Sequence, residues 1–96
     1  MSKIRKSAQG EECSLRLDCC NYNTDTTVFA HISIKGNSGI GTKPIDLHGV
    51  YACSDCHDAI DGRVKGVQFS DSDKLRAMIE TQGKLVKKGL VTFETF

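Results

Sequence analysis

The positions of five cysteines constrain this 96-residue chain more than any other feature. Cys53 and Cys56 form a C-x2-C pair, and three further thiols lie upstream at Cys13, Cys19 and Cys20. A C-x2-C pair lets both sulfurs reach one metal ion while the backbone turns. A chain of this length buries only about two-thirds of the surface that its unfolded form exposes. We therefore expect a single domain, residues 1–96, whose stability depends on a metal or on covalent links.

The N-terminal segment and the apolar content of the chain predict its compartment. Residues 1–12 form a basic arm, with Lys3, Arg5 and Lys6, and they lack the apolar run of a secretory signal. No later segment approaches the ~18 apolar residues of a membrane span. We therefore expect a cytoplasmic protein, and disulfides are rare in that compartment.

A structural zinc ion is the prediction that fits these cysteines. An odd number of thiols cannot all pair within one chain, whereas four thiolates complete a tetrahedral zinc site. Successive side chains diverge, so one of the two adjacent cysteines is expected to be spare. The longer gap from Cys13 and the turn residues that follow favour Cys20 over Cys19. The predicted ligands are Cys13, Cys20, Cys53 and Cys56; the alternative is that these thiols are small buried apolar side chains.

The order of apolar patterns predicts a small α+β fold. Residues 26–34 alternate and are rich in β-branched side chains, which is typical of a strand, and Gly49–Ala52 predicts a short second strand. The glycine-rich segment Lys35–Asp46 between them is predicted to be a loop.

Two helices are expected after the strands. Ser54 or Asp55 can cap the first, which ends at Gly62. The second begins near Ser70–Asp73, ends at Gly89 and is weakened by Gly83. The residues predicted to face the core from this helix are Leu75, Met78, Ile79, Leu85 and Val86. The tail, residues 91–96, is expected to be an edge strand or frayed.

His57 and Asp61 suggest a second metal site. Residues i and i+4 share one face of a helix, so the two side chains can hold one ion. An imidazole and a carboxylate suit Mg²⁺, Mn²⁺, Ni²⁺ or Zn²⁺. The alternative is that Asp61 caps the turn before Gly62 and that His57 is an exposed helix residue.

His31 is the candidate general base, because a neutral imidazole accepts a proton from water near pH 7. We expect the first strand to pack beside the helix that follows the C-x2-C pair, which places His31 opposite His57. Asp46 and His48 lie just before the second strand and can orient His31 or contribute to the ion. The alternatives are a half-buried packing histidine at position 31 and solvated loop side chains at 46 and 48.

With these residues the sequence resembles the HNH, or ββα-metal, endonucleases, and among them the small lambdoid-prophage nucleases of the YbcO type. The segments that carry the resemblance are the opening Met-Ser-Lys-Ile-Arg-Lys-Ser-Ala, residues 27–32, the loop up to Lys43-Pro-Ile-Asp46 and residues 51–58. The resemblance implies a zinc-stapled ββα-metal domain with an additional C-terminal helix.

The resemblance also implies roles for single residues. His31 matches the family's general base, His57 its metal-binding histidine and Asp61 a second helix ligand, and the four cysteines match the structural zinc site. The sequence departs from the family at Ala30, where many relatives carry a metal-binding Asp or His. Asp46 is our first choice for the missing ligand. The family's middle asparagine falls near His48.

The implied activity is metal-dependent hydrolysis of phosphodiester bonds in DNA, in a phage or prophage context. Thirteen basic and twelve acidic side chains give a formal net charge of +1. Any DNA-binding surface must therefore come from a local cluster of basic side chains rather than from the charge of the whole chain. The expected phosphate contacts are Lys3, Arg5, Lys6, Lys35, Lys43 and Arg63. Because related prophage nucleases act in recombination, a recombinase filament or a phage recombination protein is a possible partner. The alternative function is a catalytically inactive, zinc-binding module that docks to DNA or protein, and Ala30 favours it.

Overall fold

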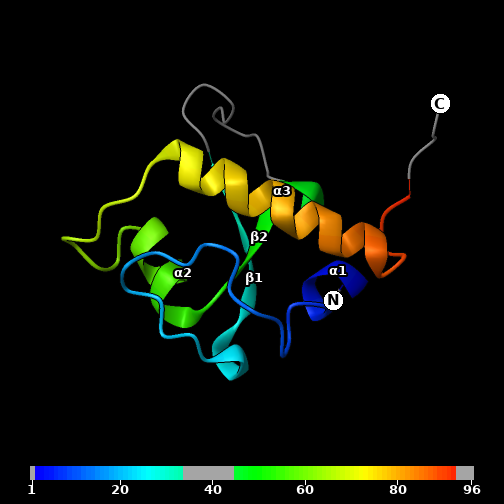
Figure 1. The fold of residues 1–96 in the computed structure, drawn as a ribbon, viewed down its shortest axis with the longest axis horizontal. Coiled ribbons are helices and arrows are strands. Elements are labelled where there is room, and N and C mark those ends of the chain that lie inside the picture. Colours follow the sequence, from blue (N-terminus) through cyan, green and yellow to red (C-terminus); the bar gives the residue numbers. More distant parts are fainter. Residues whose placement is uncertain (1, 34–44, 93–96) are drawn as a thin grey trace.

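An antiparallel pair of strands forms the centre of the fold (Figure 1). The computed structural model describes residues 2–33 and 45–92. β1 (Val28–His31) pairs with β2 (Gly49–Ala52), so that Phe29 lies opposite Tyr51 and His31 opposite Gly49. β2 has the predicted bounds. β1 is shorter than the predicted strand because Thr24–Thr26 forms a 3-10 turn, capped by the Asn23 side chain, before the strand begins.

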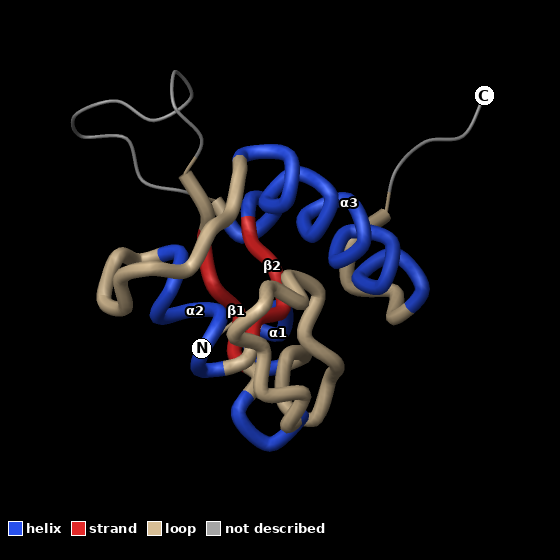
Figure 2. Tube along the Cα trace, turned by 60° about the vertical axis from the view of Figure 1, so that its left-hand side comes forward, coloured by secondary structure: helices blue, strands red, loops and turns tan. Residues whose placement is uncertain are grey.

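The two faces of the strand pair have different partners. Side chains alternate along each strand, so Ala30 and Val50 point to one face, and Phe29 and Tyr51 point to the other. The first face packs against α2 (Ser54–Ile60) through Cys56 and Ala59 in a buried cluster that includes the upstream cysteine loop. The second face lies toward α1 (Lys3–Lys6) and the C-terminal half of α3 (Asp71–Lys87). Figure 2 shows α2 beside β1 and α3 along β2.

The outer edge of β2 is covered by α3 and by the N-terminal loop. The backbone N–H of Tyr51 donates to Thr81 Oγ1 at 3.2 Å, and the Tyr51 carbonyl accepts from the backbone N–H of Ser14 at 2.7 Å. Both backbone groups of a buried residue are thus satisfied without a third strand.

α3 begins and ends as the sequence predicts, but its buried face is different. Ser70 and Asp73 form a reciprocal capping box, and Gly89 adopts a left-handed φ of 73° after the last turn. The buried residues are Ala77, Thr81 and Leu85. Of the predicted stripe, Leu85 is buried and Met78 is partly buried, whereas Leu75, Ile79 and Val86 are 46%, 61% and 38% exposed. α3 touches only one edge of a two-stranded sheet, so a narrow row of side chains spaced four residues apart is enough to cover that edge. Ala77 and Thr81 in this row are small, which allows the helix to approach β2 closely.

The cap of α2 lies one residue before the two predicted cap residues, Ser54 and Asp55. Cys53 occupies the cap position, and its Sγ accepts the backbone N–H of Cys56 at 3.4 Å. The helix is followed by Gly62 with a φ of 78°, as predicted.

The N-terminal residues do not form a free arm. Ser2 caps α1, Ala8 is buried with Tyr51 and Leu85, and Ile4 packs against the same cluster. Ser7 Oγ lies 2.7 Å from the Tyr51 hydroxyl, which links the segment to β2. The basic side chains of α1 are left on its exposed side. Among the described residues, no helix has the length and apolar content needed to cross a membrane. The tail prediction is not tested beyond Thr92, because residues 93–96 lie outside the described part.

Candidate metal centre and histidine pairs

Four cysteine sulfurs from two distant parts of the chain meet beside α2. The ligand atoms of Cys13, Cys20, Cys53 and Cys56 all lie within 4.8 Å of one another in a buried cluster. The sulfurs of Cys20 and Cys53 are 3.8 Å apart, and none of the four thiols forms a disulfide. Zinc–sulfur bonds of ~2.3 Å in a tetrahedron require sulfur–sulfur distances of about 3.8 Å. The donor set and its spacing therefore fit a zinc ion.

Backbone N–H groups support this cluster from outside. The N–H of Arg16 donates to Cys13 Sγ at 3.5 Å, as that of Cys56 does to Cys53. Arg16 and Tyr22 have left-handed φ values of 48° and 54°, which is uncommon for residues other than glycine and curls the chain around the sulfurs of Cys13 and Cys20. Such donors stabilise a thiolate, the form that binds zinc.

The thiols differ in how readily they ionise without a metal. Burial raises the pKa of Cys20 to about 11, and burial also raises the pKa of Cys56. Burial acts in the same direction on Cys53, but backbone hydrogen bonds from Cys56 and Asn21 outweigh it and lower the pKa of that thiol. A divalent cation would offset the burial of several thiolates together.

Cys19 is outside the sulfur cluster, as the sequence predicts. Its Sγ faces the backbone carbonyl of Asp55 at 3.6 Å, and the residue is half-buried. Adjacent side chains diverge, so Cys20 reaches the cluster and Cys19 does not.

On the other face of the strand pair, His31 forms a pair with Asp46. His31 Nε2 lies 2.9 Å from Asp46 Oδ1, and both side chains are about a quarter exposed, at 27% and 24%. The guanidinium Nε of Arg5 donates to the same carboxylate oxygen at 3.4 Å. The ring of Phe29 meets the His31 ring edge-on, with centroids 5.4 Å apart. The sequence did not predict that Arg5 joins this pair.

The electrostatics of the pair favour an ionised Asp46. The hydrogen bond from His31, together with Ser2 and Arg5, holds the pKa of Asp46 below its ordinary value. A carboxylate that accepts the Nε2–H of His31 leaves the lone pair on Nδ1, where the ring can accept a proton. His48 is half-buried in the 3-10 turn Asp46–His48, and none of the hydrogen bonds found in residues 2–33 and 45–92 involves its side chain. Of the two predicted partners, the structure brings Asp46 to His31.

His57 and Asp61 form a second pair on α2. His57 Nε2 lies 3.0 Å from Asp61 Oδ2, as the i, i+4 spacing predicts. Arg63 reaches both Asp61, at 3.7 Å, and Asp58, at 3.2 Å. The charge of Arg63, a predicted phosphate contact, is thus shared with two carboxylates.

The two pairs do not join into one cluster. Within the part of the chain that the structure describes, the four cysteines are the only group in which three or more metal-binding side chains converge. The expected convergence of His31 with His57 on one ion is not seen, and alternation along β1 directs Phe29 and His31 toward α1. Ala30 instead faces α2 and is 1% exposed, so this position offers the helix no ligand.

The predicted phosphate contacts on α1 lie near His31. Lys3, Arg5 and Lys6 are exposed, and Arg5 contacts the Asp46 carboxylate directly. Lys35 and Lys43 lie outside the described residues.

Comparisons with known proteins agree with one another. Residues 2–90 match the family model described as "Putative nuclease YbcO". The chain is 43% identical over 94 residues to a protein of that name from Escherichia coli K12 and to one from Enterobacteria phage 82, covering 95% of this chain and 98% of each relative. A solved structure titled "Structure of a putative bacteriophage protein" from E. coli K-12 matches with a TM-score of 0.69 and 37% identity, over 91% of this chain and 100% of that one.

Proposed function

The chain belongs to the family described as "Putative nuclease YbcO", and from this premise we propose that it is a metal-dependent endonuclease that hydrolyses phosphodiester bonds in DNA. The observation that carries the proposal is the His31–Asp46 pair with Arg5 beside it. A base, a carboxylate that orients it and a cation for the phosphate are the components that this hydrolysis needs.

In the proposed reaction, His31 takes a proton from the attacking water at Nδ1. Asp46 holds the ring through Nε2 and stabilises the imidazolium that forms, as carboxylates do in other histidine-based sites. Arg5 is close enough to Asp46 to place positive charge beside the same site. The bond from phosphorus to the 3′ oxygen breaks as the bond from water to phosphorus forms. The 3′ oxygen leaves with the electron pair and takes a proton from solvent water, and the phosphate keeps its negative charge.

His57 and Asp61 are the proposed ligands of a divalent ion. They supply two donors on one helix face, which suits an ion such as Mg²⁺ that keeps several water ligands. When bound, such an ion supplies Lewis-acid stabilisation of charge on phosphate oxygens. Because this pair lies apart from His31, its contribution is tested separately from that of the base.

The proposed architecture is a single HNH-like, or ββα-metal, domain over residues 1–96. Its support is the element order β1, β2, α2 with the Cys53–Cys56 pair at the start of α2. A zinc ion on the four cysteines would hold this unit together, and α3 would be the additional helix. Lys3, Arg5, Lys6 and Arg63 are the proposed DNA contacts, and a phage recombination protein or recombinase filament is a proposed partner.

Nicking of supercoiled plasmid tests the activity. The zinc-loaded protein is incubated with Mg²⁺, Mn²⁺ or Ni²⁺ beside His31→Ala and, separately, His57→Ala. We expect nicking by the wild type and a loss of about 10²-fold or more in His31→Ala. Equal nicking by wild type and His31→Ala would end the nuclease proposal. If recombinase-coated single strands are required, they restore cutting by the wild type but not by His31→Ala.

One observation favours a second function, a zinc-stabilised docking module without catalysis. Ala30 is 1% exposed and offers no ligand, and within the described residues His57 and Asp61 do not converge with His31 and Asp46 into one group of metal-binding side chains. An ion on His57 and Asp61 would therefore have few protein donors near the base. DNA binding without nicking under every condition above would support this alternative.

A further inference from the structure

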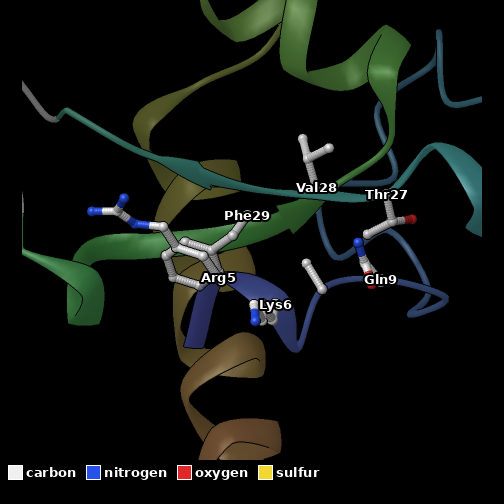
Figure 3. Close-up of a pocket in the computed structure, with 7 residues that line it drawn as sticks. Arg5, Lys6, Gln9, Thr27, Val28 and Phe29 are labelled. Carbon is white, nitrogen blue, oxygen red and sulfur yellow. The ribbon is translucent and has the colours of Figure 1, made fainter. Parts of the chain in front are cut away.

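A groove lies between α1 and β1 (Figure 3), and two of its lining residues, Phe29 and Arg5, contact His31 and Asp46. Its volume is about 280 Å³, just below the range of drug-sized ligand sites, so it can hold a ligand no larger than about one nucleotide. The lining residues are Arg5, Lys6, Ala8, Gln9, Thr27, Val28 and Phe29. No motif in the sequence indicates this groove, because α1 and β1, which form its walls, are about 20 residues apart along the chain.

The chemistry of the lining is that of a nucleotide site. Arg5 and Lys6 are cationic, and none of the lining residues is acidic. Phe29 supplies apolar surface for a base, and the Gln9 amide offers both a donor and an acceptor to its edge.

Thr27 is the unusual member of this lining. It is 4% exposed, and its Oγ1 is the one buried side-chain oxygen or nitrogen without a hydrogen-bond partner among the described residues. An unpaired buried hydroxyl destabilises a fold, because it loses its hydrogen bonds to water and gains none in return. Because Oγ1 makes no bond where it lies, rotation of the side chain toward the groove breaks none, and a ligand there would supply the missing partner.

Two contacts connect the groove to the proposed reaction site. Phe29 lines the groove and meets the His31 ring at 5.4 Å between centroids, and Arg5 lines it while donating to Asp46. A nucleotide in the groove would therefore be a near neighbour of a phosphate beside His31.

We propose that this groove binds an unpaired nucleotide next to the phosphate at His31, with its base toward Phe29, Gln9 and Thr27 and its phosphate on Lys6. The inference rests on the proposed function and deepens it. A base that is paired and stacked in a duplex cannot enter such a groove without leaving the stack. The substrate is therefore DNA with an unpaired nucleotide at the cut, such as a single strand or a branch.

Binding can be measured without cleavage. Fluorescence anisotropy compares a labelled single strand of about 12 nucleotides with its duplex, using zinc-loaded protein and no added Mg²⁺. We expect the single strand to bind about tenfold more tightly, although the higher charge density of a duplex would favour the opposite order. Equal or tighter binding of the duplex would overturn the inference.

Two variants locate the site. Thr27→Val and Gln9→Leu are each expected to weaken single-strand binding about five- to tenfold, the loss of one hydrogen bond. Thr27→Val removes an unpaired buried hydroxyl, so its melting temperature should equal or exceed that of the wild type. Gln9 is exposed, so its variant is expected to fold normally. Lys65→Gln, on the loop between α2 and α3 and outside the groove lining, is the matched control and should bind as wild type does.

Wild-type affinity in both groove variants would overturn the inference. The outcome is separable from that of the nuclease proposal. Nicking by wild type together with unaltered binding in Thr27→Val and Gln9→Leu would contradict the proposed nucleotide site and leave the nuclease proposal standing. Weakened binding in both variants without any nicking would support the proposed nucleotide site and contradict the nuclease proposal.

Discussion

Nε2 of His31 lies 2.9 Å from Oδ1 of Asp46, although the residues are 15 positions apart in sequence. His31 ends β1 and Asp46 begins the turn that leads into β2, so the pairing of the two strands brings these side chains together. The contact couples the proposed base to a carboxylate whose pKa is already lowered.

Asp46→Asn tests this coupling. The amide keeps the shape of the carboxylate but neither accepts Nε2–H as strongly nor stabilises an imidazolium. We expect plasmid nicking to fall about 10²-fold with unchanged zinc content. Glu80→Gln, a carboxylate of α3 paired with Arg16, is the control and should nick as wild type does. Full activity in Asp46→Asn would show that His31 works without this partner.

The adjacent cysteines give a sharp test of the zinc site. Protein purified without added zinc should contain close to one zinc per chain by elemental analysis. Cys20→Ser should lose most of its bound zinc, and its free energy of unfolding should fall by several kcal/mol, because metal binding energy is folding energy in small domains. Cys19→Ser should keep both, since Cys19 lies outside the cluster. Loss of zinc in both variants to the same extent would contradict the assignment.

Glu80 predicts a pH dependence of stability. The hydrogen bond from Arg16 lowers the pKa of Glu80, against burial and with help from Lys84 and Arg76. A carboxylate whose pKa is lowered by folding stabilises the fold fully above its ordinary pKa, and this contribution is lost as pH falls through the folded value. In urea unfolding, Glu80→Gln should therefore be less stable than wild type near neutral pH, and the difference should shrink as the pH falls below the ordinary pKa of a glutamate carboxyl. A difference that does not vary with pH would exclude the ionic explanation.

Two glycines should respond in opposite directions to alanine. A Cβ at Gly83, in the exposed middle of α3, meets no atom within 4 Å, so Gly83→Ala should stabilise the protein by about 0.5–1 kcal/mol through helix propensity. A Cβ at Gly49 would run into the Phe29 ring, so Gly49→Ala should cost about 1–3 kcal/mol. Chemical denaturation measures both. A stabilising Gly49→Ala would show that the Phe29 ring can move freely.

Much of the fold followed from local signals. β2, the end of α2 at Gly62 and both ends of α3 depend on alternation, caps and left-handed glycines, all of which act within a few residues. The apolar stripe of α3 was only partly right, because periodicity shows that a helix is amphipathic but not how wide a surface it meets. Leu75 and Ile79 are exposed for that reason.

The sequence by itself determined the cysteine centre. Spacing, an odd count and the divergence of adjacent side chains were enough to select Cys20 over Cys19, because each of these constraints is set by the covalent chain. Only the tertiary structure decided what surrounds His31. One face of β1 meets α1 and the other meets α2. This choice depends on long-range packing, because the local sequence patterns of these elements are compatible with either face of the strand. That packing brought Asp46 into contact with His31, brought Arg5 into contact with Asp46, and formed the groove between α1 and β1.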